Sequence, residues 1–188
     1  MSYLIITIAI IIAIFLFSII IISVCCINVL NSLRNSINTY SLNINNKFEL
    51  FIKSVNNFIF ICKPHIKYED NLFIELENQI DLLTKSKSIC KKANAKQIID
   101  NNINSILELS EAYTALSNSE DFINSKNNII KINEEFNKDI TIYNEYVTKY
   151  NIRLEKLPHK IFKNILNYKQ LELFIPKKRK EKSIEIDM

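Results

Sequence analysis

Apolar residues fill almost every position at the start of the chain. Up to Val24 they are interrupted only by isolated Ser and Thr residues, and none of these side chains is charged. A bilayer core ~30 Å thick needs about 20 apolar residues in a helix, and residues 4–24 supply that length. No basic segment precedes the run and no small-residue cleavage site follows it, as a signal peptide would require. We therefore predict a retained transmembrane anchor over residues 1–30, which contacts the lipid bilayer through residues 4–24.

Beyond the anchor, apolar residues recur every three to four positions, and the alternation of a strand is nowhere sustained. The anchor helix is expected to continue to Pro64, because no helix breaker precedes that proline. A second helix is predicted from Tyr68 to Tyr113, with a polar stretch over residues 85–92 that bends or loosens it. The core positions predicted on the first helix are Leu30, Leu33, Ile37, Ile44, Phe48, Phe51, Val55 and Phe58.

A third predicted helix has the clearest apolar seam, which only Lys126 and Asn133 interrupt. Ser117, with Glu120 three residues later, is interpreted as a capping box at its start, and Pro158 ends it. A short last helix leads toward Phe174. The sequence thus predicts an all-α fold, in which the transmembrane helix continues into an antiparallel four-helix bundle with long helices over residues 31–175. The seam residues are Phe122, Ile129, Phe136, Ile140, Tyr143, Val147, Tyr150, Leu154 and Leu157.

The composition excludes several classes of nucleotide-binding, catalytic and calcium-binding motif, because the chain contains no glycine. The P-loop, the dinucleotide-binding fingerprint, the nucleophile elbow and the EF-hand loop all use glycine for a tight turn or a close backbone approach. Helix ends that need a left-handed residue also prefer glycine, so asparagine is expected to take that place.

Charge is nearly balanced, with 24 basic residues against 20 acidic ones. The net charge of +4 is matched by segment 177–182 alone, where five basic residues accompany Glu181. The helical body is therefore close to neutral, and no nucleic-acid partner is expected. The basic tail, predicted as disordered over residues 176–188, fits a nuclear import signal, a tether to an anionic membrane surface or a plain solvated terminus.

Few residues suggest catalysis or metal binding. The four cysteines do not follow a zinc-site spacing, and both histidines lie near prolines. Glu108 and Glu111 share a helix face, but a carboxylate metal bundle also needs Glu-x-x-His motifs, which the sequence lacks. We expect no catalytic residue, no cofactor and no metal site. The cysteines are Cys25, Cys26, Cys62 and Cys90.

Segment 143–151 reads Tyr-Asn-x-x-Val-x-x-Tyr-Asn and is followed by Pro158. It resembles the YNxxVxxYN…P signature of the LemA family of bacterial membrane-anchored helical proteins. Segment 110–122 is similar to the family's EAYPxLKANxxF pattern, and segment 30–37 is similar to its LxxLRNxV pattern. The chain resembles a divergent member, since Thr114, Tyr68 and Ile140 replace residues that are common there and the family's late Gly-Phe is missing.

We interpret the matching residues as mainly structural. Tyr143, Val147 and Tyr150 share one helix face, which favours a place in the core over a cofactor site. Asn144 and Asn151 lie seven residues apart on an adjacent stripe. Their amides are expected to satisfy a buried polar contact to another helix or to fix its register, in preference to binding a ligand.

Arg34 is expected to pair with Glu111 or Glu134 if the bundle is antiparallel. Such an ion pair would hold two helices together and would not act in catalysis. The complete set of family-motif residues to which we assign structural roles is Leu33, Arg34, Glu111, Tyr113, Phe122, Tyr143, Asn144, Val147, Tyr150, Asn151 and Pro158.

The resemblance implies a membrane-anchored, non-catalytic helical protein that serves as a scaffold or interaction module at the bacterial envelope, with a protein partner or as a homo-oligomer. One alternative is a eukaryotic-type membrane-tethered coiled-coil factor routed by its basic tail, and a weaker one is a carboxylate metal-binding bundle. No Lys or Arg precedes the anchor, while Arg34, Lys47 and Lys53 follow it. The positive-inside rule therefore predicts an N-terminus outside the cell membrane and a cytoplasmic body.

Overall fold

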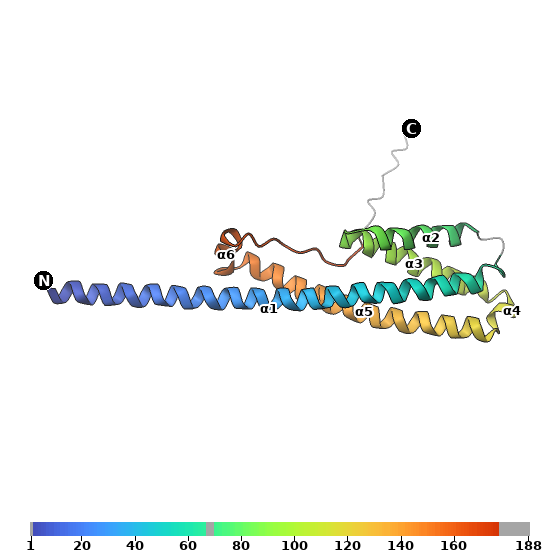
Figure 1. The fold of residues 1–188 in the computed structure, drawn as a ribbon, viewed down its shortest axis with the longest axis horizontal. Coiled ribbons are helices and arrows are strands. Elements are labelled where there is room, and N and C mark those ends of the chain that lie inside the picture. The colour runs from blue at the N-terminus through green and yellow to red at the C-terminus, as the bar shows by residue number, and fades with distance from the viewer. Residues whose placement is uncertain (1, 67–69, 177–188) are drawn as a thin grey trace, which may run out of the picture. The chain divides into compact units, whose positions relative to one another are not determined.

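The computed structural model describes residues 2–66 and 70–176, and these residues form helices without any strand (Figure 1). The all-α prediction is confirmed. The predicted basic tail falls mostly on residues 177–188, which lie outside the described residues. The elements are α1 (Ser2–Cys62), α2 (Asp70–Lys85), α3 (Ile89–Ser110), α4 (Thr114–Ser117), α5 (Glu120–Glu155) and α6 (His159–Ile165).

The chain divides into two compact units, and both long helices contribute to each. The first unit contains Met1–Leu42 and Thr141–Leu171, and the second contains Asn43–Ile140 and Glu172–Met188. The first unit therefore holds the start of α1, the end of α5 and all of α6. The second holds α2, α3, α4 and the remaining parts of α1 and α5. The domain boundaries predicted at residues 30 and 175 stay a prediction.

Helix α1 runs without a break from Ser2 to Cys62, as its lack of glycine and proline predicts. Within the described residues it is the one helix long and apolar enough to cross a membrane, and the mean hydropathy of its most apolar window is 3.4. Side chains from Tyr3 to Ile22 are exposed on every face of this helix. Burial begins only at Cys26 and then follows the helical period through Leu30 and Ile37.

The predicted single helix from Tyr68 to Tyr113 is wrong, because the structure breaks it into α2 and α3. Residues 86–88 are not helical, and Ser88 has extended dihedral angles. The Ser86 hydroxyl accepts a hydrogen bond from the Ser88 amide at 3.2 Å. Such local side-chain bonds compete with helical ones and permit a reversal. The two helices consequently pack side by side as a hairpin (Figure 1).

The predicted capping box of Ser117 and Glu120 is also wrong. Ser117 lies inside the short helix α4, where its hydroxyl bonds to the Thr114 carbonyl at 3.4 Å. The residue that caps α5 is Ser119, whose hydroxyl accepts the amide hydrogen of Phe122 at 3.1 Å. This bond satisfies one of the free amide groups in the first turn of the helix.

In the second unit, α1 and α5 pack antiparallel through aromatic side chains. The ring centroids of Phe48 and Phe136 are 4.8 Å apart in an edge-on arrangement, and those of Phe58 and Phe122 are 5.9 Å apart. In the first unit, Tyr40 of α1 stacks on Tyr146 of α5 at 5.7 Å.

Burial along α5 follows the predicted seam, with two differences. Seven of the seam residues are buried, but Ile140 is half-buried and Leu157 is 73% exposed. Leu157 misses the core because α5 ends at Glu155, before the proline that was expected to end it. On α1, Leu33 is half-buried while the other predicted core positions are buried.

Asparagine takes the place of glycine at the end of α6, as the composition predicts. Asn167 has a φ angle of 52°. The Tyr168 amide donates to the Lys163 carbonyl at 3.0 Å, which is the six-to-one bond of a Schellman motif.

Replacing Val147 by Asp should destabilise the first unit. Val147 has no exposed surface, and burying a carboxylate there should lower the free energy of unfolding by about 3 to 5 kcal/mol. Thermal unfolding of the full chain in detergent, followed by circular dichroism, measures the effect. Thr148→Asp is the matched control, because Thr148 is exposed one position along the same helix. Equal melting of the two variants would refute the seam assignment.

Candidate functional site

The tyrosines and valine of the segment 143–151 lie in the core of the first unit. Tyr143, Val147 and Tyr150 are 3%, 0% and 2% exposed. Burial raises the pKa of the Tyr150 phenol, while the positive charge of Arg34 acts in the opposite direction. A phenol with a raised pKa stays protonated at neutral pH, so Tyr150 provides apolar volume and a hydroxyl group but no charge.

Asn151 holds the main chain of an extended segment in the first unit. Its Nδ2 donates to the Leu171 carbonyl at 2.9 Å, and its Oδ1 accepts from the Leu171 amide at 3.0 Å. The side-chain amide thereby satisfies both backbone polar groups of Leu171, as a residue of a neighbouring strand would. The sequence pattern predicted a polar contact to another helix, and this contact is made to a segment without regular structure. Asn144 is half-buried.

Two more side chains hold the same part of the first unit. The Tyr168 hydroxyl donates to Asn31 Oδ1 at 2.9 Å, and Gln170 Nε2 donates to Glu155 Oε1 at 3.1 Å. Lys163 also forms an ion pair with Glu155. The segment that follows α6 is therefore fixed by side chains and not by a backbone ladder.

The other motif residues are spread over both units. In the first unit, Leu33 is half-buried, and Arg34 and Pro158 are exposed. In the second, Glu111 is exposed, Tyr113 is half-buried, and Phe122 is buried. The pairing of Arg34 with Glu111 or Glu134 stays a prediction, because the arginine and the glutamates belong to different units.

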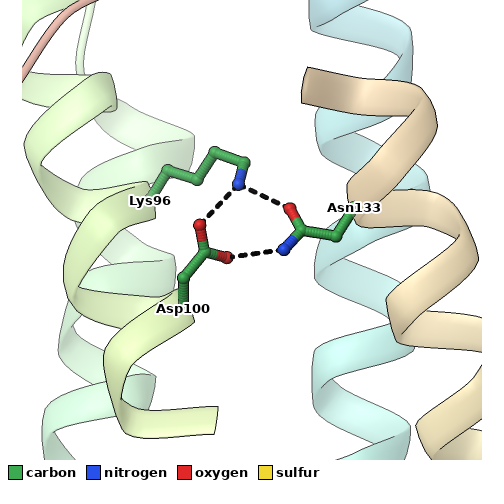
Figure 2. Close-up of polar contacts among 3 residues, drawn as sticks. All are labelled: Lys96, Asp100 and Asn133. Atoms are coloured by element: carbon green, nitrogen blue, oxygen red, sulfur yellow. Dashed lines mark hydrogen bonds and ion pairs between the residues drawn. The ribbon is translucent and has the colours of Figure 1, made fainter. Parts of the chain in front are cut away.

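The most developed polar site of the second unit is a network of Lys96, Asp100 and Asn133 (Figure 2). Lys96 Nζ lies 2.6 Å from Asp100 Oδ2 and 2.6 Å from Asn133 Oδ1. Asn133 Nδ2 donates to Asp100 Oδ1 at 3.3 Å, which closes the ring of contacts. Lys96 and Asp100 come from α3, and Asn133 comes from α5, so the network joins two helices of this unit.

Aromatic rings enclose the lysine of this network. Lys96 is only 4% exposed, and its Nζ lies 5.2 Å from the ring centroids of both Phe51 and Phe136. The ammonium group is thus compensated by one carboxylate, one amide oxygen and two ring faces. Desolvation raises the pKa of Asp100, and the charge and hydrogen bond of Lys96 oppose that shift.

A small cavity of about 60 Å³ adjoins the network. Asp100 and Asn133 form part of its wall, together with Asn104 and Lys126. Its other lining residues are the apolar Phe58, Ile103, Leu107, Ile129 and Ile130. A cavity of this size has room for water beside the carboxylate, since one water needs about 10 to 15 Å³.

Part of this network could be predicted from the sequence, although the helical period alone does not identify it as a site. Asn133 interrupts the apolar seam of α5, and Lys96 and Asp100 are spaced by four residues, which places them on one helix face. A polar residue at a seam position requires a partner. The identity of that partner depends on how α3 packs, which the sequence pattern does not give.

A second polar contact in this unit joins α1 to α5 by two reciprocal pairs. Asn57 Nδ2 donates to Ser125 Oγ at 3.3 Å, and Asn128 Nδ2 donates to Ser54 Oγ at 3.0 Å. Each helix contributes one Ser and one Asn spaced by three residues, so the antiparallel pairing matches a donor with an acceptor twice. These contacts favour one register of the two helices.

Burial shifts the pKa of one cysteine and of one histidine. Burial raises the pKa of the Cys62 thiol to about 12, so this thiol stays protonated and unreactive at neutral pH. Burial and the charge of Arg153 lower the pKa of His159. In the part of the chain that the structure describes, no three His, Cys, Asp or Glu side chains are grouped to hold a metal ion.

The fold and the motif positions define a class of helical protein, in which a long apolar N-terminal helix continues into a body of antiparallel helices. The chain belongs to the LemA family, which matches it over residues 41–188. The resemblance seen in the sequence is thereby confirmed. A search of the curated proteins found no match.

Replacing Lys96 by Met should leave Asp100 as a half-buried carboxylate without its cation. We expect the free energy of unfolding to fall by about 3 kcal/mol at neutral pH. Because Lys96 lowers the pKa of Asp100, its loss should raise that pKa further. The folded variant then holds a proton that the unfolded chain releases, so its stability should decrease as the pH rises above the ordinary carboxyl range.

Chemical denaturation in detergent at about pH 4.5 and about pH 7.5 measures this difference, and the deficit should be smaller at the lower pH. Lys96→Met combined with Asp100→Leu should recover much of the loss, because no charge remains buried. Lys91→Met, at an exposed position of the same helix, is the control and should change stability by at most about 0.5 kcal/mol. A deficit independent of pH would show that Asp100 is not the group left uncompensated.

Proposed function

We propose that this LemA-family protein is a single-pass, non-catalytic scaffold of the bacterial cell membrane, anchored by the first part of α1. The helical body carries surfaces for a protein partner or for another copy of the chain. The observation that carries the proposal is the exposure of an uncharged apolar helix on all its faces from Tyr3 to Ile22. Such a helix matches the length and polarity of a bilayer core.

Continuity of α1 supports a mechanical role for the anchor. The helix extends 38 residues beyond Val24 before it ends at Cys62. It enters the packed part of the chain without any intervening loop. The anchor and the first packed residues thus belong to one helix of the first unit, which suits a scaffold better than a flexible linker between them would.

The polar groups of the helical body support the non-catalytic part of the proposal. Lys96, Asp100 and Asn133 bond to one another, and Asn151 bonds to the Leu171 backbone. The Lys96 network joins α3 to α5 in the second unit, and the Asn151 contact joins α5 to the segment after α6 in the first unit. Exposed apolar side chains on the second unit, such as Phe60 at 79% and Ile74 at 51%, offer contact area for a protein partner.

Two charges in the membrane segment test the anchor. Ile11→Arg with Ile12→Arg should oppose insertion by about 5 to 7 kcal/mol and release the chain into the soluble or carbonate-extractable fraction. Asn45→Arg with Asn46→Arg adds the same charge at exposed positions of α1 and is the control. Carbonate extraction of membranes separates the outcomes. Release of the wild-type chain, or equal retention of both variants, would refute the anchor.

Single cysteines test the proposed orientation. In a chain whose four cysteines are replaced by Ala or Ser, Lys53→Cys lies in the helical body and Ser2→Cys precedes the anchor. A cytoplasmic body predicts that a membrane-impermeant maleimide labels the Ser2 position in intact spheroplasts but labels the Lys53 position only after lysis. The reversed pattern would place the body outside and overturn this part of the proposal.

A further inference from the structure

Helix α6 lies close to the point where the exposed apolar run of α1 ends. The Tyr168 hydroxyl, three residues after α6, donates to Asn31 Oδ1 at 2.9 Å. Asn31 follows Val24 by seven residues, which is about 10 Å along a helix. Within the first unit, Figure 1 shows α6 at the end of α5 that is nearer to the N-terminal part of α1. The chain around α6 therefore adjoins the anchor.

Burial of α1 begins at the same level. Cys26 and Leu30 are buried, and the first unit offers residues 141–171 to cover them. Cys26 is two residues beyond Val24, or about 3 Å along the helix. The lipid headgroups add about 5 to 7 Å to each side of the hydrocarbon core. When residues 4–24 span that core, the first covered residues of α1 fall within the headgroup layer.

Large apolar side chains around α6 are exposed although they lie in a short segment of the chain. Leu157 precedes the helix, Ile161 belongs to it and Leu166 follows it, and all three are exposed. Exposed apolar residues that are gathered in one place and bordered by polar ones mark a site of contact with a protein or a membrane. The nearness of α6 to the end of the anchor favours the membrane.

The same segment concentrates positive charge. Residues 153–169 contain five basic side chains and one acidic one, although the helical body as a whole is nearly neutral. Lys163 forms an ion pair with Glu155. Basic side chains next to apolar ones are typical of segments that lie on an anionic membrane surface. The other four basic residues are exposed, namely Arg153, Lys156, Lys160 and Lys169.

We propose that Leu157, Ile161 and Leu166, with Lys156 and Lys160, form a second membrane contact, which we call the α6 surface. Its apolar side chains enter the interfacial layer of the leaflet from which α1 emerges, and its lysines meet the anionic headgroups there. This inference rests on the proposed anchor, because an inserted α1 holds α6 at this depth. A spanning helix takes its tilt and rotation from its interfacial contacts, so the α6 surface fixes the orientation of the first unit at the membrane.

Quenchers carried by the lipids test this contact in the full-length chain. The four cysteines are replaced by Ala or Ser, and Ile161→Cys is labelled with a small fluorophore. The protein is reconstituted into vesicles of phosphatidylethanolamine and phosphatidylglycerol, in which a fraction of the acyl chains is brominated. Leu42→Cys, labelled in the same way, is the matched control. Leu42 is an exposed apolar residue of the same unit, about 27 Å beyond Val24 along α1.

The expected result is quenching at position 161 that is about threefold stronger than at position 42, or more. Lys156→Gln with Lys160→Gln should reduce the quenching at position 161 by about half, because the attraction to anionic headgroups is lost. Lys131→Gln with Lys138→Gln removes the same charge from exposed positions of α5 and should leave the quenching unchanged. Equal quenching at positions 161 and 42, or an equal effect of the two lysine pairs, would overturn the proposal.

A label inside the anchor separates failure of this contact from failure of the anchor. Ile12→Cys should be quenched by lipids that are brominated deep in their acyl chains if α1 spans the bilayer. Quenching at position 12 but not at position 161 would overturn the α6 surface as a membrane contact and leave the anchor supported. Quenching at position 161 but not at position 12 would refute the anchor and leave the contact supported. Quenching at neither position would refute both.

Thermal unfolding verifies that the label does not disrupt the first unit. Ile161 is exposed, so the labelled chain should melt within a few degrees of the unlabelled one when circular dichroism is followed in detergent. A labelled chain that melts early is replaced by one labelled at Leu157→Cys, for which the same pattern of quenching is expected and the same results would overturn the proposal.

Discussion

The unbroken hydrogen-bond ladder of α1 is the constraint on which the rest of the structure depends. From Ser2 to Cys62 the helix contains neither glycine nor proline, so nothing separates its lipid-compatible part from its packed part. Only the side chains, and not the backbone, differ between the lipid-compatible part and the packed part of α1. Exposed apolar residues on all faces give way, from Cys26 onward, to burial with the helical period. The register of this stripe then decides which face of α1 meets α5 in each unit.

Polar contacts restrict a packing that aromatic residues stabilise. Rings such as those of Phe51 and Phe136 bury large apolar surfaces, but they tolerate small shifts along a helix. The pairs of Ser and Asn between α1 and α5 and the network around Lys96 oppose such a shift. A displacement of one turn would leave two buried serine hydroxyls and a buried ammonium group without these partners. A buried ion pair adds little net stability. The contacts of Asn133 with both members of this pair are the ones that favour one arrangement of α3 and α5.

The sequence predicted the elements well and their ends and partners less well. Helical period and the lack of breakers identified α1 and α5, since these signals are local and repeat many times. The turn between α2 and α3 lies in the polar stretch over residues 85–92 that was expected to bend or loosen one helix. A complete break was not predicted, because serines such as Ser86 and Ser88 also occur within helices. Ser119 was missed as a cap for a similar reason, since Ser117 offered an equally good local pattern. The Lys96 network and the contact of Asn151 with Leu171 depend on tertiary packing, which periodicity does not contain.

Residues after α6 are held in place by a different kind of contact from the one that holds the helices. The helices are held by repeated backbone bonds and continuous seams, so removing any one contact leaves most of the structure intact. The segment from Asn167 to Pro176 is held by separate side-chain contacts, among them the amide of Asn151 in the first unit and the ring of Phe174 in the second. The order of this segment therefore depends on side chains presented by the helices, because its own backbone forms no helix or strand that could hold it.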